Sequence, residues 1–233
     1  MVTFVVAHGA WSAGWAWKKM HPLMAVRGHR LFTPSHTGLG ERAHLARPEV
    51  NLDTHIADIV GVLEMEDLRG VILIGHSYGG MVATGAAARA RDRVGKLVYV
   101  DAFAPRDGDS VLSLTPDREK PLREAVAKMG DGWLIPPNPM PADTPDEDRA
   151  WADPRRKRQP VKTFDQPLSM PGGELTIPRH YIYCTRHPAN DPFRQFLERA
   201  RGEGWGVSEI DASHNPHITC PDVLMGVLDQ TAK

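Results

Sequence analysis

A serine flanked by glycines stands where two contrasting stretches of this chain meet. Gly75-His76-Ser77-Tyr78-Gly79 has the form G-x-S-x-G. The apolar run 71–74 before it predicts a buried strand, and the small residues 80–88 after it predict a tightly packed helix. A serine on such a sharp turn has its hydroxyl pushed out of the sheet, and the crowded backbone needs glycine on both sides. The pattern predicts a nucleophile for acyl transfer at Ser77; the alternative is a glycine-rich turn whose serine only caps the helix.

A serine nucleophile requires a base, and the base is expected on a loop after the last strand. The stretch 211–217 follows that strand and carries two histidines. His214 comes first, after two small residues, and is the candidate base; His217 is its competitor. The spacing H-x-x-H could also indicate a metal pair, but no carboxylate or cysteine lies at a matching spacing, so no metal is expected.

The developing oxyanion requires amide donors, and these are expected from the loop after the first strand. Sheets of this kind place their first and third strands side by side. His8-Gly9-Ala10-Trp11 supplies that loop, and Gly9 allows its backbone to turn toward Ser77. The amides of Ala10 and Tyr78 are therefore the predicted oxyanion donors. Simple packing is the alternative interpretation for most of the tryptophans in 11–17.

Strands and helices alternate along most of the chain and would position these groups. Near-continuous apolar strands alternating with helices predict a parallel sheet covered on both faces, within a single domain over 1–233. The expected strands are 2–7, 30–34, 71–75, 96–101, 179–184 and 206–210. The expected helices are 14–26, one capped by Asn51 or Asp53, the one after Ser77, 191–201 and 221–230.

Residues 105–177 interrupt this alternation. Prolines recur throughout the segment, which excludes sheet, while helical patches are expected at 118–129 and 145–152. A long insertion between two core strands is usually functional. The segment is predicted to form a cap over the site; the alternative is an embellishment packed away from the chemistry.

Composition narrows the class of protein. Hydrophobic residues make up 41% and charged residues 24% of the 233, and the formal net charge is -1. The chain therefore has no strong electric field that would attract nucleic acid or an anionic membrane. The two cysteines suit a reducing compartment. A strand beginning at Val2 leaves no room for a signal peptide, and no run approaches membrane-spanning length. A cytoplasmic enzyme is expected, as a monomer or homodimer.

The chain resembles the small, six-stranded α/β-hydrolases that include plant methyl-salicylate esterases, hydroxynitrile lyases and many bacterial esterases. The resemblance covers nearly the whole length. It rests on the stretches 4–11 (FVVAHGAW), 37–42 (TGLGER), 75–80 (GHSYGG) and 99–105 (YVDAFAP), and on Ser213-His214 with Pro221 seven residues later. It implies an α/β-hydrolase fold with strand order 2-1-3-4-5-6, a capped pocket and a Ser-His-Asp hydrolase.

The acid of that triad has two candidates. Many relatives carry an Asp two or three residues past the fifth strand, but this chain has Arg186-His187-Pro188 there, and its first carboxylate is Asp191. Asp101 ends the fourth strand, next to the strand that carries Ser77. Its neighbours are apolar, and an unpaired carboxylate would be costly among them. Asp101 is the favoured acid and Asp191 the alternative; Asp101 could instead be a structural carboxylate that accepts backbone amides.

The predicted activity is two-step hydrolysis of small to medium hydrophobic carboxylic esters, without a cofactor. Trp11, Phe103 and Trp133 are plausible pocket walls. A hydroxynitrile lyase is disfavoured, because lyases of this family resemble H-T-I in the first loop and carry Lys after the histidine, where this chain has Gly9 and Asn215. A cofactor-independent dioxygenase and a non-catalytic ligand-binding receptor are further alternatives.

Overall fold

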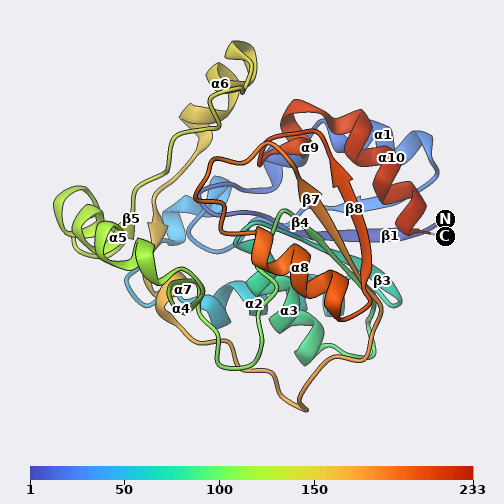
Figure 1. Ribbon diagram of the computed structural model, residues 1–233. Coiled ribbons are helices and arrows are strands. Elements are labelled where there is room, and N and C mark those ends of the chain that lie inside the picture. The colour runs from blue at the N-terminus through green and yellow to red at the C-terminus, as the bar shows by residue number, and fades with distance from the viewer. Residues whose placement is uncertain (233) are drawn as a thin grey trace.

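Six parallel strands form the central sheet of the computed structural model, which describes residues 1–232 (Figure 1). They run in the order β2-β1-β3-β4-β7-β8. When only the six strands of this sheet are numbered along the chain, the order is 2-1-3-4-5-6. This is the predicted order, so the α/β-hydrolase sheet is confirmed. The strands are β1 (Thr3–Ala7), β2 (Arg30–Phe32), β3 (Val71–His76), β4 (Val94–Val100), β7 (Arg179–Cys184) and β8 (Gly206–Ile210).

Helices cover both faces of this sheet. Phe4 and Val6 pack on one face, whereas Val5 and Ala7 pack on the other, because successive side chains of a strand point in opposite directions. Both sets are buried, which explains why the strands are almost continuously apolar. The first face is covered by α1 (Met20–Val26) and α10 (Pro221–Thr231), and the second by α2 (Leu52–Met65), α3 (Gly79–Arg89) and α8 (Arg194–Gly202).

The predicted helix over 14–26 is wrong as a single element. The structure has a 3-10 helix, η1 (Gly14–Trp17), followed by the separate helix α1. Pro22 gives the reason, because it has no N–H to donate to the carbonyl of Lys18 four residues earlier. Proline is best tolerated in the first turn of an α-helix, and α1, which begins at Met20, places Pro22 there.

The insertion 105–177 contains a sheet that its prolines were expected to exclude. The short strands β5 (Leu134–Ile135) and β6 (Gln159–Pro160) pair in antiparallel fashion, with Leu134 opposite Pro160. Pro160 is tolerated because a two-stranded ladder consists of edges only, where an N–H can be dispensed with. The sequence-based exclusion of sheet was therefore wrong.

Helices make up the rest of the insertion. They are α4 (Val111–Leu114), α5 (Pro116–Met129), α6 (Asp146–Ala152), η3 (Asp153–Arg155) and α7 (Lys162–Asp165). In Figure 1, α5 and α6 stand out from the sheet, while α7 lies against α2 and α4 lies against α7. The remaining short elements are η2 (Gly40–Leu45) and α9 (Pro216–Thr219). Within residues 1–232, no helix combines the length and apolar character needed to cross a membrane.

Candidate active site

Ser77 lies on the tight turn between β3 and α3. Its φ of 54° is in the left-handed region, which a non-glycine residue rarely adopts. A Cβ at Gly79 would lie 2.0 Å from the carbonyl oxygen of Ala7, so only glycine lets α3 approach β1 this closely. The Ser77 carbonyl accepts the amide of Phe103 at 3.1 Å and that of Gly80 at 3.1 Å. These contacts hold the strained turn, and with it the hydroxyl, in place.

Two hydrogen bonds join Ser77 to His214 and His214 to Asp101. His214, in the loop between β8 and α9, places its Nε2 at 2.9 Å from the Ser77 Oγ. Its Nδ1 lies 2.6 Å from the Asp101 Oδ2. An Nδ1–H that donates to the carboxylate leaves Nε2 free to accept the serine proton. This is the arrangement that a serine nucleophile and its base require.

Asp101 is fully buried at the end of β4 and also has a left-handed backbone, with φ at 45°. Its Oδ1 accepts the Cys184 amide at 3.2 Å and the Nε2–H of His187 at 2.8 Å. Burial by itself would raise the pKa of Asp101, but the hydrogen bonds from His187 and His214 and the charges of these histidines outweigh it and lower the pKa. The side chain is therefore a carboxylate that three donors satisfy.

The alternative acid and the alternative base are held in other environments. Asp191 accepts the hydroxyl of Tyr183 at 2.6 Å and the amide of Phe193 at 2.7 Å, next to the start of α8. His217 is buried and stacks on the ring of Trp17, with centroids 4.6 Å apart. Burial lowers the pKa of His217 well below its usual value, so this ring is neutral.

The two predicted oxyanion donors belong to loops that meet beside Ser77. Ala10 follows β1, which pairs with β3 through Ala7 and Gly75, and Tyr78 follows Ser77 directly. Within residues 1–232, the amides of Ala10 and Tyr78 donate no hydrogen bond. The Tyr78 side chain points into the core instead, where its hydroxyl lies 3.0 Å from His55 Nδ1. The hydroxyl of Tyr78 is thus engaged in the core and not at Ser77.

Trp11 connects the loop after β1 to the insertion. Its amide donates to Gln159 Oε1 at 3.0 Å, its indole Nε1–H donates to the Ile135 carbonyl at 3.1 Å, and its carbonyl accepts the Lys157 amide at 3.0 Å. Its ring packs against that of Phe164, with centroids 6.2 Å apart. Trp11 therefore bonds to both strands of the small ladder.

The other two predicted pocket walls lie at different depths. Phe103 is buried, and its ring meets those of Phe193 and Phe196 edge-on, at 5.3 and 5.8 Å. Trp133 is half-buried between α5 and β5, and its carbonyl accepts the amide of Val161 at 2.8 Å. Phe103 thus packs within the aromatic core next to the Ser77 turn, and Trp133 packs within the insertion.

Sequence reasoning missed three side chains around His214 and Asp101. His187 bonds to Asp101, and the ring of Phe193 stacks on that of His214, with centroids 5.0 Å and planes 10° apart. His76 donates its Nε2–H to the His214 carbonyl at 2.8 Å. Burial and the neighbouring His214 lower the pKa of His76 to about 3, so it stays neutral. Of the three, only His187 had a signal in the sequence, because it lies shortly after a core strand, at the place where many relatives carry the acid.

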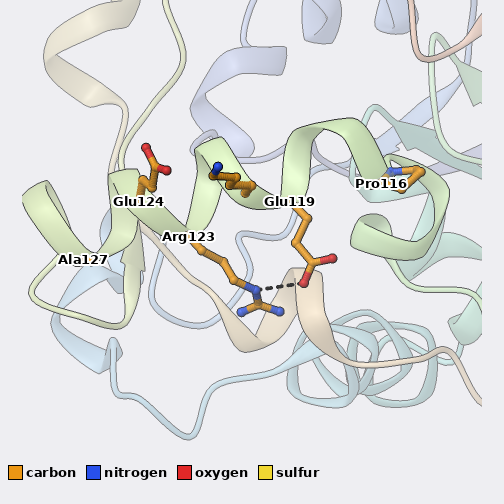
Figure 2. A pocket seen from close by; sticks show the side chains of 6 residues that line it. Pro116, Glu119, Arg123, Glu124 and Ala127 are labelled. Atoms are coloured by element: carbon orange, nitrogen blue, oxygen red, sulfur yellow. Dashed lines mark hydrogen bonds and ion pairs between the residues drawn. The ribbon is translucent and has the colours of Figure 1, made fainter.

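A shallow hollow elsewhere on the molecule is separate from these groups. Figure 2 shows that it follows α5, where Arg123 pairs with Glu119 at 2.8 Å. Its lining is Pro116, Glu119, Lys120, Arg123, Glu124 and Ala127. In the described part of the chain, no three His, Cys, Asp or Glu side chains are grouped so that they could hold a metal ion.

Comparisons with known proteins agree with the fold. The model of the alpha/beta hydrolase family matches residues 4–227. A carbendazim hydrolyzing esterase of Nocardioides sp. (strain SG-4G) is 36% identical, over 96% of this chain and 97% of its own. A pyrethroid hydrolase of Sphingobium wenxiniae is 26% identical, over 94% and 84%. A solved extracellular alpha/beta-hydrolase from a Paenibacillus species has a TM-score of 0.87 at 22% identity, over 99% and 98% of the two chains.

Proposed function

This chain belongs to the alpha/beta hydrolase family, and from that premise we propose that it hydrolyses small to medium hydrophobic carboxylic esters through a Ser-His-Asp triad and an acyl-enzyme. Of the similar curated proteins, one is an esterase by name and another a hydrolase. In this chain Ser77 is the nucleophile, His214 the base and Asp101 the acid. The reaction requires no metal or organic cofactor.

One observation supports the proposal above all others. The hydrogen bonds of 2.9 Å from Ser77 to His214 and of 2.6 Å from His214 to Asp101 join a hydroxyl, an imidazole and a buried carboxylate in series. Each side chain lies at the end of a different core strand. A helix cap would explain the serine alone, but it would not explain this series.

The mechanism follows from these positions. His214 Nε2 takes the proton of the Ser77 hydroxyl as the oxygen attacks the ester carbonyl, and the amides of Ala10 and Tyr78 stabilise the oxyanion. The imidazolium then gives its proton to the leaving alcohol, and the acyl group stays on Ser77. A water molecule, deprotonated by His214, attacks the acyl carbonyl; the acid is released and the Ser77 hydroxyl regains its proton. Asp101 stabilises the imidazolium in both steps.

The insertion 105–177 acts in this proposal as the cap over the site. Trp11, Phe103 and Trp133 are proposed to shape its acyl or alcohol pocket, directly or by supporting the residues that do. Apolar packing around the turn favours hydrophobic esters, because burial of apolar substrate surface provides the binding free energy. Carbendazim and pyrethroids, named for the two bacterial relatives, belong in any substrate panel.

Substitution of the nucleophile tests the proposal. We expect Ser77→Ala to reduce kcat on p-nitrophenyl esters by about 10³-fold or more, since a triad works as a unit. Unfolding temperature should change little, because the side chain removed is small. The measurement is initial rate against ester chain length, with thermal unfolding of both proteins. Activity within tenfold of the wild type would contradict the mechanism.

A serine-reactive phosphonate separates an esterase from a non-catalytic receptor on the same scaffold. The wild-type protein should be labelled stoichiometrically at Ser77, and Ser77→Ala should remain unlabelled by intact-mass spectrometry. A wild type that is not labelled and turns over no ester in the panel would favour the receptor.

A further inference from the structure

His187 lies on the far side of Asp101 from His214. It follows β7 by three residues, in the loop that leads to α8. Its Nε2 is 2.8 Å from the Asp101 Oδ1, while His214 takes the Oδ2. The His187 side chain is 7% exposed and the Asp101 side chain is fully buried. The carboxylate is therefore bound between two imidazoles, only one of which contacts Ser77.

A carboxylate bound on one oxygen alone keeps a rotational freedom that matters at this position. Rotation of Asp101 about its Cβ–Cγ bond would turn Oδ2 out of line with His214 Nδ1. The Cys184 amide restrains Oδ1 from the backbone, but at 3.2 Å it is the longest of the three contacts. The 2.8 Å bond from His187 supplies a second, shorter restraint on the same oxygen. A reacting group displaced by about 1 Å can lose on the order of 100-fold in rate.

We propose that His187 is a positioning residue of the triad, which donates its Nε2–H to Asp101 Oδ1 and so holds Oδ2 against His214. The inference rests on the proposed function, because it assigns His187 a role only if Asp101 and His214 act together. His187 acts through Asp101 and does not contact the serine. The loop after β7 thus supplies a donor to an acid that comes from the end of β4.

The groups around His187 suit a donor in this position. On its other side, His187 Nδ1 lies 3.6 Å from the Asp191 Oδ1, and its ring lies 5.3 Å from that of Tyr183. Arg194 of α8 is the nearby cation, and the His214 ring is 6.3 Å away. Burial lowers the pKa of His187, but the hydrogen bond and the charge of Asp101 outweigh it, so the pKa is raised. Nε2 carries its proton in the charged form and in the neutral tautomer that bonds to Asp101.

Substitution of His187 by leucine and by glutamine tests the inference. We expect His187→Leu to lower kcat by about 10- to 100-fold with KM within about threefold. His187→Gln keeps a donor at the same reach and should restore kcat to within about fivefold of the wild type.

A matched control uses the same strand. His180 bonds to Ser208 Oγ at 2.9 Å from within β7, and His180→Leu removes a comparable bond outside the site. It should leave kcat and KM unchanged. Thermal unfolding of every variant shows whether it folds. If His187→Leu does not fold, the kcat of His187→Gln still tests the inference.

Three results would overturn the inference. They are a kcat for His187→Leu within twofold of the wild type, a rise in KM as large as the fall in kcat, or a glutamine variant as impaired as the leucine variant. Labelling by the phosphonate distinguishes failure of the positioning role from failure of the proposed esterase function. A wild type that is labelled and active while His187→Leu is normal loses only the positioning role. A wild type that is neither labelled nor active loses the esterase itself.

Discussion

At the scale of single residues, the site depends on the directions of hydrogen bonds around Asp101. The carboxylate accepts from a backbone amide and two imidazoles, so it needs no proton to satisfy its burial. Ser77 and Asp101 both have left-handed backbones. Such strain costs on the order of 1–3 kcal/mol at each position and persists only where the surroundings enforce it. The two strained residues lie at the ends of neighbouring strands, on either side of His214.

Replacement of each candidate acid by its amide separates their roles. In Asp101→Asn we expect kcat to fall by about 10³- to 10⁴-fold, because the amide N–H would face His214 Nδ1 and favour the tautomer that protonates Nε2. In Asp191→Asn we expect a change within about threefold, since that side chain bonds Tyr183 and the Phe193 amide. Both are measured by steady-state kinetics on one ester. Equal losses in the two variants would contradict the assignment of Asp101.

At the scale of elements, the loop after β1 and the small ladder of the insertion form one hydrogen-bonded unit. Gln159 is fully buried in β6, where its Oε1 accepts the Trp11 amide and its Nε2 donates to Thr163 Oγ1 at 2.8 Å. Ala10 immediately precedes Trp11. In the proposed mechanism, displacement of the insertion would therefore disturb an oxyanion donor as well as access to the site.

Loss of the Gln159 side chain tests this connection. We expect Gln159→Leu to destabilise the protein by about 1–3 kcal/mol, because the Trp11 amide loses its acceptor. We also expect kcat to fall by about tenfold as the Ala10 amide loses its fixed position. Urea unfolding and steady-state kinetics measure the two effects.

Gln166→Leu is the matched control for that variant. It removes the 3.2 Å bond from the Asp53 amide, in the first turn of α2, to the Gln166 side chain of the insertion. It should lower stability slightly and leave kcat within about twofold. If both variants reduce kcat equally, the loop has no special dependence on Gln159.

At the scale of the whole molecule, several buried histidines are neutral in the folded state. Burial lowers the pKa of His8 and His55 to about 4 and that of His76 to about 3, and lowers those of His36 and His217 well below the usual 6.5. His8, in the loop that carries Ala10, stacks on the ring of His36, with centroids 3.9 Å apart. The fold thus excludes protons that the unfolded chain would bind.

Stability should therefore fall steeply in mild acid. Below pH 6.5 the unfolded chain protonates these histidines while the folded chain does not, down to about pH 4 for His8 and His55 and about pH 3 for His76. Each contributes a loss of up to about 1.4 kcal/mol per pH unit across that window. Urea unfolding at pH 8, 7, 6 and 5 measures it. Free energies of unfolding that do not change between pH 7 and pH 5 would contradict the neutral cluster.

Local signals in the sequence predict most of the core strands and helices and the reactive side chains at their ends. The glycine pattern around Ser77, the apolar strands and the small-residue helix are local signals, and the structure has the sheet order that the resemblance implies. Local signals failed where the outcome depends on neighbours. Pro160 lies in a strand because its ladder has only two strands, and both are therefore edge strands. The expected helix over 14–26 is divided, and α1 begins where Pro22 falls in its first turn.

The contacts of Asp101 with His214 and with His187 depend on the tertiary structure. Asp101 and Asp191 were both available in the sequence, but only the meeting of the loops after β4, β7 and β8 sets which carboxylate faces His214. His187 reaches Asp101 across 86 positions of the chain. Periodicity and spacing describe neighbours within a few residues, whereas a hydrogen bond requires two groups to be about 3 Å apart. That distance is set by the packing of the strands, which no single segment of the sequence encodes.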